Sequence, residues 1–276
     1  MKYGFVFPGG DARTAADCAY EAEQAGWDGF FVWEPVWGVD AWVSLTAAAM
    51  RTERIRLGTM ITPVSRMRPW KLASETATLD NLSGGRVILS VGLGAIDTGF
   101  EQFGEVTDRK IRAELLDEGL EILTGLWRGQ PFAYSGKHYH VREAKFNVPP
   151  PPMQQPRIPI WVVGAWPRPK SMLRALKYDG LLPAIMDADG KVRMGPPSVD
   201  ELRQIQAYIA VNRTPSTPFD IVQEGQTPGD DHHRALDIIQ AWADAGVTWW
   251  IEASWTATNL DQVLTRIRQG PPTVSQ

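Results

Sequence analysis

The chain has 276 residues, of which 22% are charged, and its 28 basic against 32 acidic residues give a formal net charge of -4. This length is typical of one barrel domain of roughly 250 residues, so we treat residues 1–276 as a single domain. The scattered basic residues argue against nucleic-acid binding, and no apolar run approaches the ~20 residues that span a bilayer.

The first half of the chain alternates short apolar runs, which predict strands, with segments whose apolar residues recur at helical spacing. Because the first strand begins at once, without a cleavable signal, we expect a cytoplasmic protein. The first three predicted helices begin at aspartate or proline, which are favoured at helix starts. In order, the elements are a strand at 2–7, a helix at 11–26, a strand at 29–33, a helix at 40–50, a strand at 55–61, a helix at 69–83, a strand at 87–91 and a helix at 111–127.

The second half begins with an insertion at about 129–157, between the fourth helix and the fifth strand. Its FAYSGKHYHV run predicts a hairpin, and VPPPPMQQP is a proline-rich linker that cannot pair inside a sheet. The alternation then resumes with strands at 158–163, 179–182, 218–223 and 247–252, and helices at 169–177, 198–211, 230–245 and 260–268.

Eight strands alternating with eight helices predict an α/β fold, a (β/α)8 TIM barrel with one insertion. The alternative is an open doubly wound sheet with a nucleotide loop at Gly92-Leu93-Gly94. A dinucleotide fingerprint follows the first strand and opens into a helix, whereas these glycines follow the fourth strand and open into a long loop. The barrel is therefore preferred.

Three motifs in residues 54–95 carry a resemblance to a known family: the Arg68-Pro69 helix start, the TLDNLSGGR turn and the GLG after the fourth strand. With RAELLDEGLEILTGLW, GKHYHV and PRIPIWVVGAWPRPKSMLRALKYDG, they resemble the bacterial-luciferase-like family of flavin-dependent oxidoreductases. The resemblance covers the chain from Met1 to about Pro183. It implies a TIM barrel that holds FMN or the deazaflavin coenzyme F420 at the carboxyl ends of its strands.

In a barrel, functional residues come from these carboxyl ends and the loops that follow them. Here they are mostly aromatic and apolar, which suits a planar ring, and Trp33, Trp37, Trp166 and Trp255 could wall such a pocket. Tryptophans that merely plug the barrel are the alternative. The predicted cofactor-binding residues are Phe7, Trp33, Met60, Ile61, Thr62, Gly92, Gly94, Gly164, Ala165, Trp166, Arg168 and Pro183.

The resemblance assigns some of these positions more closely. It implies a bulge with a non-prolyl cis peptide near Met60 and Ile61, pressed against the middle ring. The run from Gly164 to Arg168, ahead of the helix at Pro169, suits the cofactor phosphate, because helix N-termini attract anions. For Arg112, a structural role is favoured over a reach toward the cofactor.

The chain also departs from the family pattern. Pro35 stands where relatives have a histidine after the second strand, Ala95 stands where sugar-phosphate dehydrogenases have a glutamate, and residues 182–185 lack the hydroxyl that serves the phosphate. Glu34 is the predicted catalytic carboxylate, as proton carrier or polar anchor. Its alternative is a structural partner for Arg66 or Arg68.

We expect a flavin-dependent oxidoreductase of the luciferase-like monooxygenase type, using reduced FMN or F420 on an unidentified small organic substrate. The alternatives are a non-catalytic relative, for which Pro35 is the best support, and a glycoside hydrolase that pairs two of Glu34, Glu224 and Glu252. No spacing of histidines predicts a metal site. A homodimer through the helix at 40–50 follows only by analogy, and the buried lone thiol of Cys18 is expected to be inert.

Overall fold

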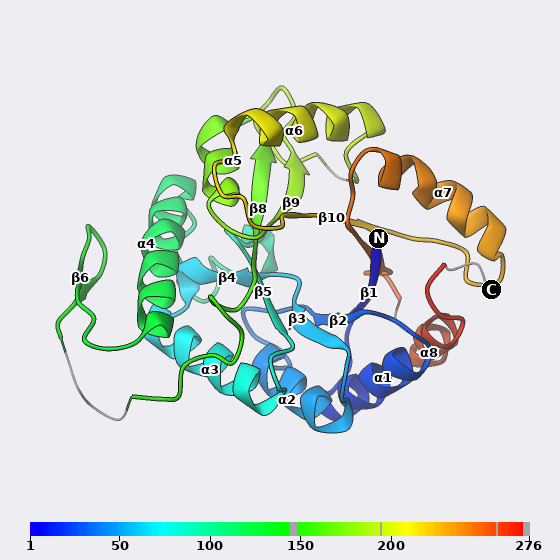
Figure 1. Ribbon diagram of the computed structural model, residues 1–276, viewed down its shortest axis with the longest axis horizontal. Helices are drawn as coiled ribbons and strands as arrows, with labels where there is room; N and C mark the ends of the chain where they lie inside the picture. The colour runs from blue at the N-terminus through cyan, green and yellow to red at the C-terminus, as the bar shows by residue number, and fades with distance from the viewer. Residues whose placement is uncertain (144–147, 194, 258, 273–276) are drawn as a thin grey trace.

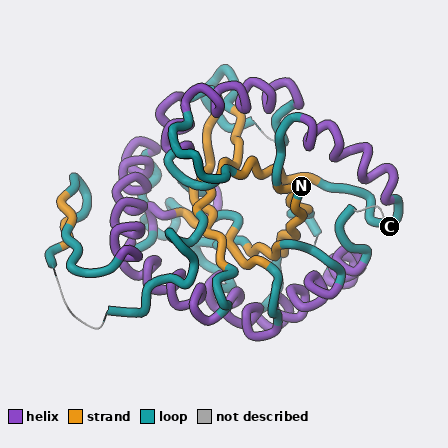
Figure 2. The backbone as a smooth tube through the Cα atoms, viewed as in Figure 1, coloured by secondary structure: helices purple, strands orange, loops and turns teal. Residues whose placement is uncertain are grey.

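The computed structural model describes residues 1–143, 148–193, 195–257 and 259–272. Eight parallel strands form an inner ring and the helices surround it, as Figures 1 and 2 show, which confirms the (β/α)8 prediction. The eight strands are β1 (Lys2–Phe7), β2 (Gly29–Val32), β3 (Arg56–Thr59), β5 (Val87–Gly92), β8 (Ile160–Trp166), β9 (Gly180–Ile185), β10 (Asp220–Gly225) and β11 (Trp249–Ala253).

The ring follows the order β3-β2-β1-β11-β10-β9-β8-β5 and closes where β3 pairs with β5, Leu57 opposite Val87. The strand predicted at 55–61 is interrupted by a bend. After the bend the short strand β4 (Thr62–Pro63) continues the pairing with β5, Thr62 opposite Val91. The peptide between Met60 and Ile61 at this bend is cis, at the position that the family resemblance implied.

Strands β8 and β9 run three residues further than the sequence predicted. Gly164, Ala165 and Trp166 pair with 183–185 of β9, so this segment belongs to the sheet and not to the following loop. The apolar run that predicted β8 stopped at Val163 because a glycine interrupts it. Pairing with a neighbouring strand, which no local pattern reveals, carries the strand onward.

The outer helices are α1 (Ala12–Gln24), α2 (Ala41–Arg51), α3 (Pro69–Leu82), α4 (Arg109–Arg128), α5 (Pro169–Leu176), α6 (Val199–Asn212), α7 (His232–Asp244) and α8 (Leu260–Arg268), with short 3-10 turns η1 (Val64–Arg66) and η2 (Ile96–Thr98). Side-chain caps fix several of their starts. Asp40 accepts a hydrogen bond from the Val43 amide, and Ser198 with Glu201 forms a complete capping box. Helices α3 and α5 begin with proline, as predicted.

Aromatic rings fill the inside of the barrel. Phe31, Trp161 and Trp249 contact one another, with ring centroids 5.6 Å (Phe31–Trp161), 5.1 Å (Trp161–Trp249) and 6.1 Å (Phe31–Trp249) apart. A Cβ at Gly4 or Gly29 would lie 2.7 Å from the Phe31 ring, so these glycines make room for it. The three rings form an aromatic plug across the barrel.

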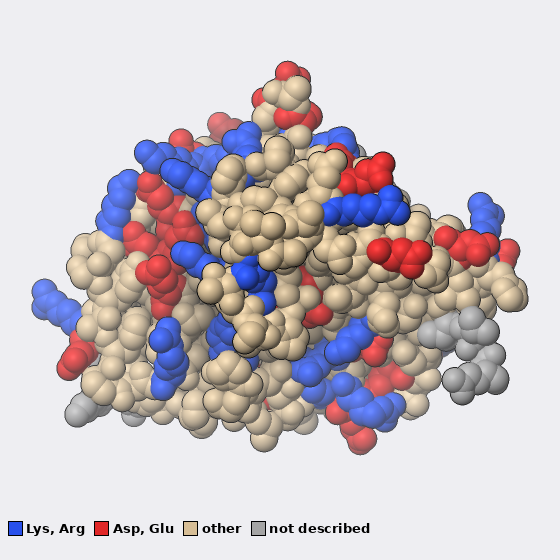
Figure 3. All heavy atoms as spheres, turned by 45° about the horizontal axis from the view of Figure 1, so that its top comes forward, with Lys and Arg blue, Asp and Glu red and all other residues tan. Residues whose placement is uncertain are grey.

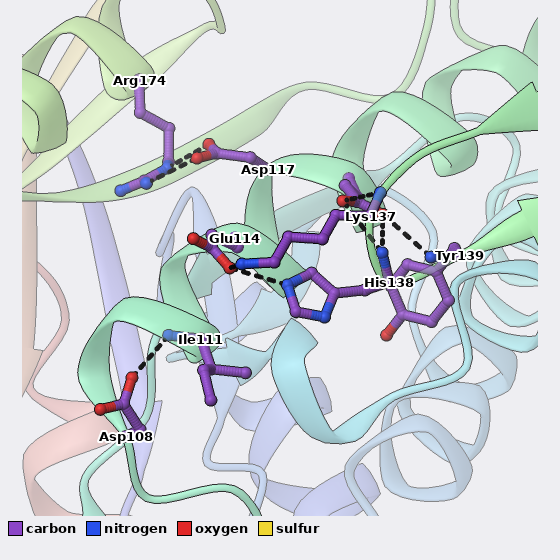
Figure 4. Close-up of polar contacts among 9 residues, drawn as sticks. Asp108, Ile111, Glu114, Asp117, Lys137, His138, Tyr139 and Arg174 are labelled. Atoms are coloured by element: carbon purple, nitrogen blue, oxygen red, sulfur yellow. Dashed lines mark hydrogen bonds and ion pairs between the residues drawn. The ribbon is translucent and has the colours of Figure 1, made fainter.

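The insertion contains the predicted hairpin, formed by β6 (Tyr134–Ser135) and β7 (His140–Val141), which lies beside α4 (Figure 1). Carboxylates of α4 hold it (Figure 4): Glu118 accepts hydrogen bonds from the amides of residues 137–139, and Glu114 accepts from Lys137 Nζ and faces His138 Nε2 at 2.8 Å. His138 thus belongs to a structural contact. In the described residues no three His, Cys, Asp or Glu side chains are grouped as for a metal.

Acidic and basic side chains are interspersed on the face that Figure 3 shows. Among the described residues, no helix has the length and apolar character needed to cross a bilayer. Cys18 is fully buried in α1, and burial raises the pKa of its thiol to about 12, as expected for an inert thiol.

Candidate active site

The inner face of the strands can be followed to the carboxyl-end mouth of the barrel. Side chains two residues apart on a strand point to the same side, so residues that follow the inner core also face the axis. The inner core includes Phe31, Val163, Leu182, Val222 and Ile251. The next inward positions are Trp33, Ala165, Ala184, Glu224 and Ala253. The mouth is therefore apolar, apart from one carboxyl at these positions.

The bend at Met60 and Ile61 borders this mouth. Met60 is buried in the inner core and Ile61 packs against it. A Cβ on Gly92 would lie 2.4 Å from Ile61 Cδ1, so only glycine lets β5 pass this close to the bend. Beside it, the hydroxyls of Thr59 and Thr62 are 2.9 Å apart. These contacts fix the shape of one wall of the mouth.

Glu34 lies on the other side of that wall. Val32, two residues earlier, belongs to the core between strands and helices. The Glu34 carboxyl continues to that side, 3.6 Å from Arg66 Nη2, and Arg66 also donates to the carbonyl oxygens of Glu34 and Pro35. Burial raises the pKa of Glu34 to about 7, against the lowering effect of the Thr62 hydroxyl and Arg66. Its Oε2 is buried without a hydrogen-bond partner among the described residues.

Two roles were predicted for Glu34: a catalytic carboxylate, or a structural partner of Arg66 or Arg68. The arginine partner named as its alternative is present, whereas the catalytic role stays a prediction. The glycoside hydrolase alternative needs two carboxyls that face each other at the mouth. Glu34 and Glu252 are both directed away from the barrel axis, so neither can pair there with Glu224. Glu252 is 3% exposed and bonds the amide and hydroxyl of Thr227, with Arg266 at 3.2 Å.

The four tryptophans predicted to wall a ring pocket lie in different environments. Trp33 and Trp255 are 42% and 43% exposed at the mouth, and Trp37 is 82% exposed in the loop after β2. Trp166 is turned outward, edge-on against Tyr208 of α6 with ring centroids 5.5 Å apart. The predicted wall of four is therefore wrong for the Trp166 side chain.

Two other predicted cofactor residues also face the helix layer. Phe7 is buried in the outer core, and a Cβ on Gly164 would meet Leu181 Cδ1 at 2.3 Å on that same side. A cleft of about 170 Å³ lies beside Phe7, Trp33 and Trp37, below the 300–1,000 Å³ that is usual for a ligand pocket. Contacts of Phe7, Gly164 or Trp166 with a ring in the mouth would have to come from the backbone.

Three arginines gather where β5 and β8 end. Arg112 is buried and donates to the carbonyl oxygens of Leu93 and Gly94, which is a structural role, as favoured from the sequence. Arg168, the N-cap residue of α5, donates to the Gly190 carbonyl. Burial and the nearby charge of Arg168 lower the pKa of Arg109, the first residue of α4.

Among the described residues, none of these three arginines lies within 4.0 Å of a carboxylate. A cation at a helix N-terminus opposes the helix dipole, so Arg109 and Arg168 lie where an anion would be favoured. Arg168 was predicted from the sequence, whereas Arg109 was not. An arginine directly after the Asp108 cap was the available signal.

The comparisons with known proteins identify the family. The model of the luciferase-like monooxygenase family matches residues 4–246. The chain belongs to this family. The resemblance drawn from the 54–95 motifs is thereby confirmed.

Three known proteins illustrate what this luciferase-like chain is similar to. An F420-dependent glucose-6-phosphate dehydrogenase of Nocardia farcinica is 29% identical over 256 aligned residues, covering 83% of this chain and 72% of the relative. An uncharacterized protein of Mycobacterium tuberculosis is 32% identical over 212 residues, covering 76% and 67%. The solved F420-dependent tetrahydromethanopterin reductase of Methanopyrus kandleri shares the fold, with a TM-score of 0.78 at 18% identity over 98% of this chain and 97% of that one.

Proposed function

We propose that this chain uses coenzyme F420 to move a hydride to or from a small organic molecule in the mouth of the barrel. As a luciferase-like family member the chain is a flavin- or deazaflavin-dependent oxidoreductase. The name of the Nocardia farcinica relative supports the deazaflavin. FMN is the second candidate, since the family resemblance implies either cofactor and the family is described as one of monooxygenases.

One observation carries the proposal: an apolar mouth lies beside a pair of arginines that no carboxylate of the described residues neutralises. Trp33 and Ile61 offer apolar surface to a planar ring, and Gly92 leaves room for the bend that borders it. Arg109 and Arg168 lie at helix N-termini where β5 and β8 end. The residues present therefore fit a cofactor that combines an apolar ring with a phosphate.

Each part of the chain has a task in this proposal. When bound, the deazaflavin supplies a two-electron hydride acceptor or donor. Trp33, Ile61 and Ala253 exclude water from the reacting carbon, and Arg109 and Arg168 hold the phosphate. Arg112 keeps the loop after β5 in place through its two carbonyl contacts.

Glu34 remains a predicted catalytic residue. Its carboxyl is half protonated near neutral pH because burial raises its pKa to about 7, which suits a proton carrier. Its position beside Arg66 favours support of the wall instead. Replacement by glutamine separates the roles: a proton carrier would lose kcat by 100-fold or more (about 10²–10⁴ is typical), and a support would change KM or stability.

Cofactor titration tests the proposal directly. The purified protein is titrated with F420 and with FMN while its tryptophan fluorescence is followed. We expect saturable quenching by F420 with a Kd of roughly 1 µM or lower, and at least ten times weaker quenching by FMN. Tighter binding of FMN would transfer the proposal to the second cofactor, and binding of neither would refute both.

A homodimer and a cytoplasmic location are two further proposals. We propose that two copies associate through α2, on which Val43 and Met50 are 61% and 70% exposed. Sedimentation of the wild type and of Val43→Glu tests this, since a charge in an apolar contact should give monomers. A cytoplasmic location is also proposed, and fractionation of the source cells tests it.

A further inference from the structure

Glu224 differs from the buried carboxyls because it is partly exposed and faces the mouth. Its strand neighbour in the sheet is Ile251, and Val222, two residues earlier, lies opposite Trp249. Val222, Trp249 and Ile251 all belong to the inner core. Since paired residues of parallel strands point to the same side, the Glu224 side chain extends toward the axis at the carboxyl end of β10.

A single described contact orients the Glu224 carboxyl. Trp255, from the loop after β11, donates its indole N–H to Glu224 Oε2 at 2.7 Å. No described arginine or lysine lies within 4.0 Å of it. Burial raises the pKa of Glu224, partly offset by this indole bond. A carboxyl partly withdrawn from water without a cation is costly to a fold, which is typical of groups kept for binding or catalysis.

The buried acids Glu34 and Glu252 are already engaged. Glu34 lies beside Arg66, and Glu252 bonds Thr227 with Arg266 nearby. The arginines near the mouth belong to the β5 and β8 side, and β9 separates that side from β10 in the ring. The mouth therefore has a cationic side, suited to the cofactor phosphate, and a carboxyl with its tryptophan on the other side.

We propose that Glu224 is the substrate-binding carboxyl of this site: it accepts a hydrogen bond from, and takes the proton of, a hydroxyl on an uncharged and largely apolar substrate. This inference rests on the proposed function and names its substrate class. A phosphate or carboxylate on the substrate would face the Glu224 carboxylate with no described cation beside it, so sugar phosphates are disfavoured. The apolar surface of Trp33, Ile61 and Ala253 suits the body of such an alcohol.

The proposed reaction is the oxidation of an alcohol to a carbonyl compound. The substrate C–H bond breaks and its electron pair leaves with the hydrogen as hydride to the oxidised deazaflavin. The O–H bond breaks, its proton passes to Glu224 Oε1 or Oε2, and the C–O bond becomes a carbonyl. In the reverse direction the protonated Glu224 returns the proton to the carbonyl oxygen. Trp255 orients the carboxyl and is a positioning residue.

Binding to the protein without cofactor provides the first test. Cyclohexanol, which is uncharged and apolar with one hydroxyl, is titrated by calorimetry into this cofactor-free protein. Glucose 6-phosphate is titrated into the protein with F420 bound, because Arg109 and Arg168 would otherwise be free to hold its phosphate. We expect saturable binding of cyclohexanol to the wild type, weakened 10- to 100-fold in Glu224→Gln, and no saturable binding of glucose 6-phosphate. Trp255→Phe should show a smaller loss. Asp237→Asn, an exposed acid of α7, serves as the control and should match the wild type.

The loaded enzyme gives the second test. With F420 bound, kcat for cyclohexanol should fall at least 100-fold in Glu224→Gln (about 10²–10⁴ is typical), while the Kd of F420 stays unchanged. Saturable binding of glucose 6-phosphate to the wild type, no saturable binding of cyclohexanol, or equal behaviour of Glu224→Gln and wild type would each overturn the inference. Failure of the proposed function is seen separately, as the absence of F420 and FMN binding. Circular dichroism confirms that each variant is folded.

Discussion

Replacing Glu34 by glutamine should stabilise the protein above pH 7 and leave its stability unchanged below about pH 4.5. The carboxyl is 8% exposed, and burial raises its pKa from 4.5 to about 7. Between these two pH values the unfolded chain releases a proton that the folded chain retains, so the free energy of unfolding of the wild type falls as pH rises. At 1.36 kcal/mol per pH unit, the loss reaches roughly 3 kcal/mol above pH 7.

Glutamine has nearly the same shape as glutamate and cannot ionise, so it removes this loss. Arg66 keeps its hydrogen bonds to the carbonyl oxygens of Glu34 and Pro35 in the variant. Urea unfolding of both proteins at several pH values between 4.5 and 8.5 measures the difference. We expect the two curves of stability against pH to coincide at pH 4.5 and to separate progressively up to pH 8.

Glu201→Gln provides a contrast of opposite sign. Arg193 holds the pKa of Glu201 down, at about 2, so the stability that Glu201 contributes is present above pH 4.5 and is lost as pH falls toward 2. This variant should be less stable than the wild type at pH 7. A Glu34→Gln variant that is less stable than the wild type at every pH would refute the reasoning, because it would mean that Glu34 is ionised and paired with Arg66.

Three other predictions concern the cofactor cations, the bend and the buried thiol. Arg109→Ala and Arg168→Ala should each weaken F420 binding about 10-fold or more but leave binding of the dephosphorylated deazaflavin unchanged; equal losses for both ligands in fluorescence titration would contradict a phosphate site. Gly92→Ala places a Cβ 2.4 Å from Ile61 Cδ1 and should cost about 1–3 kcal/mol in urea unfolding. Gly9→Ala, with nothing within 4 Å, should cost nothing measurable there, and similar losses in both would count against the clash. Because burial raises the pKa of Cys18 to about 12, a thiol reagent at pH 8 should modify it only after unfolding; rapid labelling of the folded protein would show the opposite.

The order of strands and helices was predictable because it depends on local patterns. Apolar runs located all eight barrel strands, and Asp40, Ser198 and the prolines located helix starts. The ends of β8 and β9 were not predictable, since they depend on pairing between strands that are distant in sequence. The cis peptide at Met60 was predicted only through the family resemblance.

The direction of side chains at the mouth was the harder part. Glu34 follows the strand predicted at 29–33 and Glu224 follows the one predicted at 218–223, and no sequence pattern told which of the two faces the axis. Their positions are decided by where each strand stops and by partners such as Arg66 and Trp255. Arg109 was missed because its role depends on a neighbour 59 residues away, Arg168, that only the folded barrel brings close.

The aromatic plug of Phe31, Trp161 and Trp249 has a consequence for the order of events. It closes the barrel below the site, so the site opens to solvent only at the mouth. Cofactor and substrate must arrive through the same opening and leave through it. Whichever of the two lies deeper has to bind first and dissociate last, so binding and release follow a fixed order.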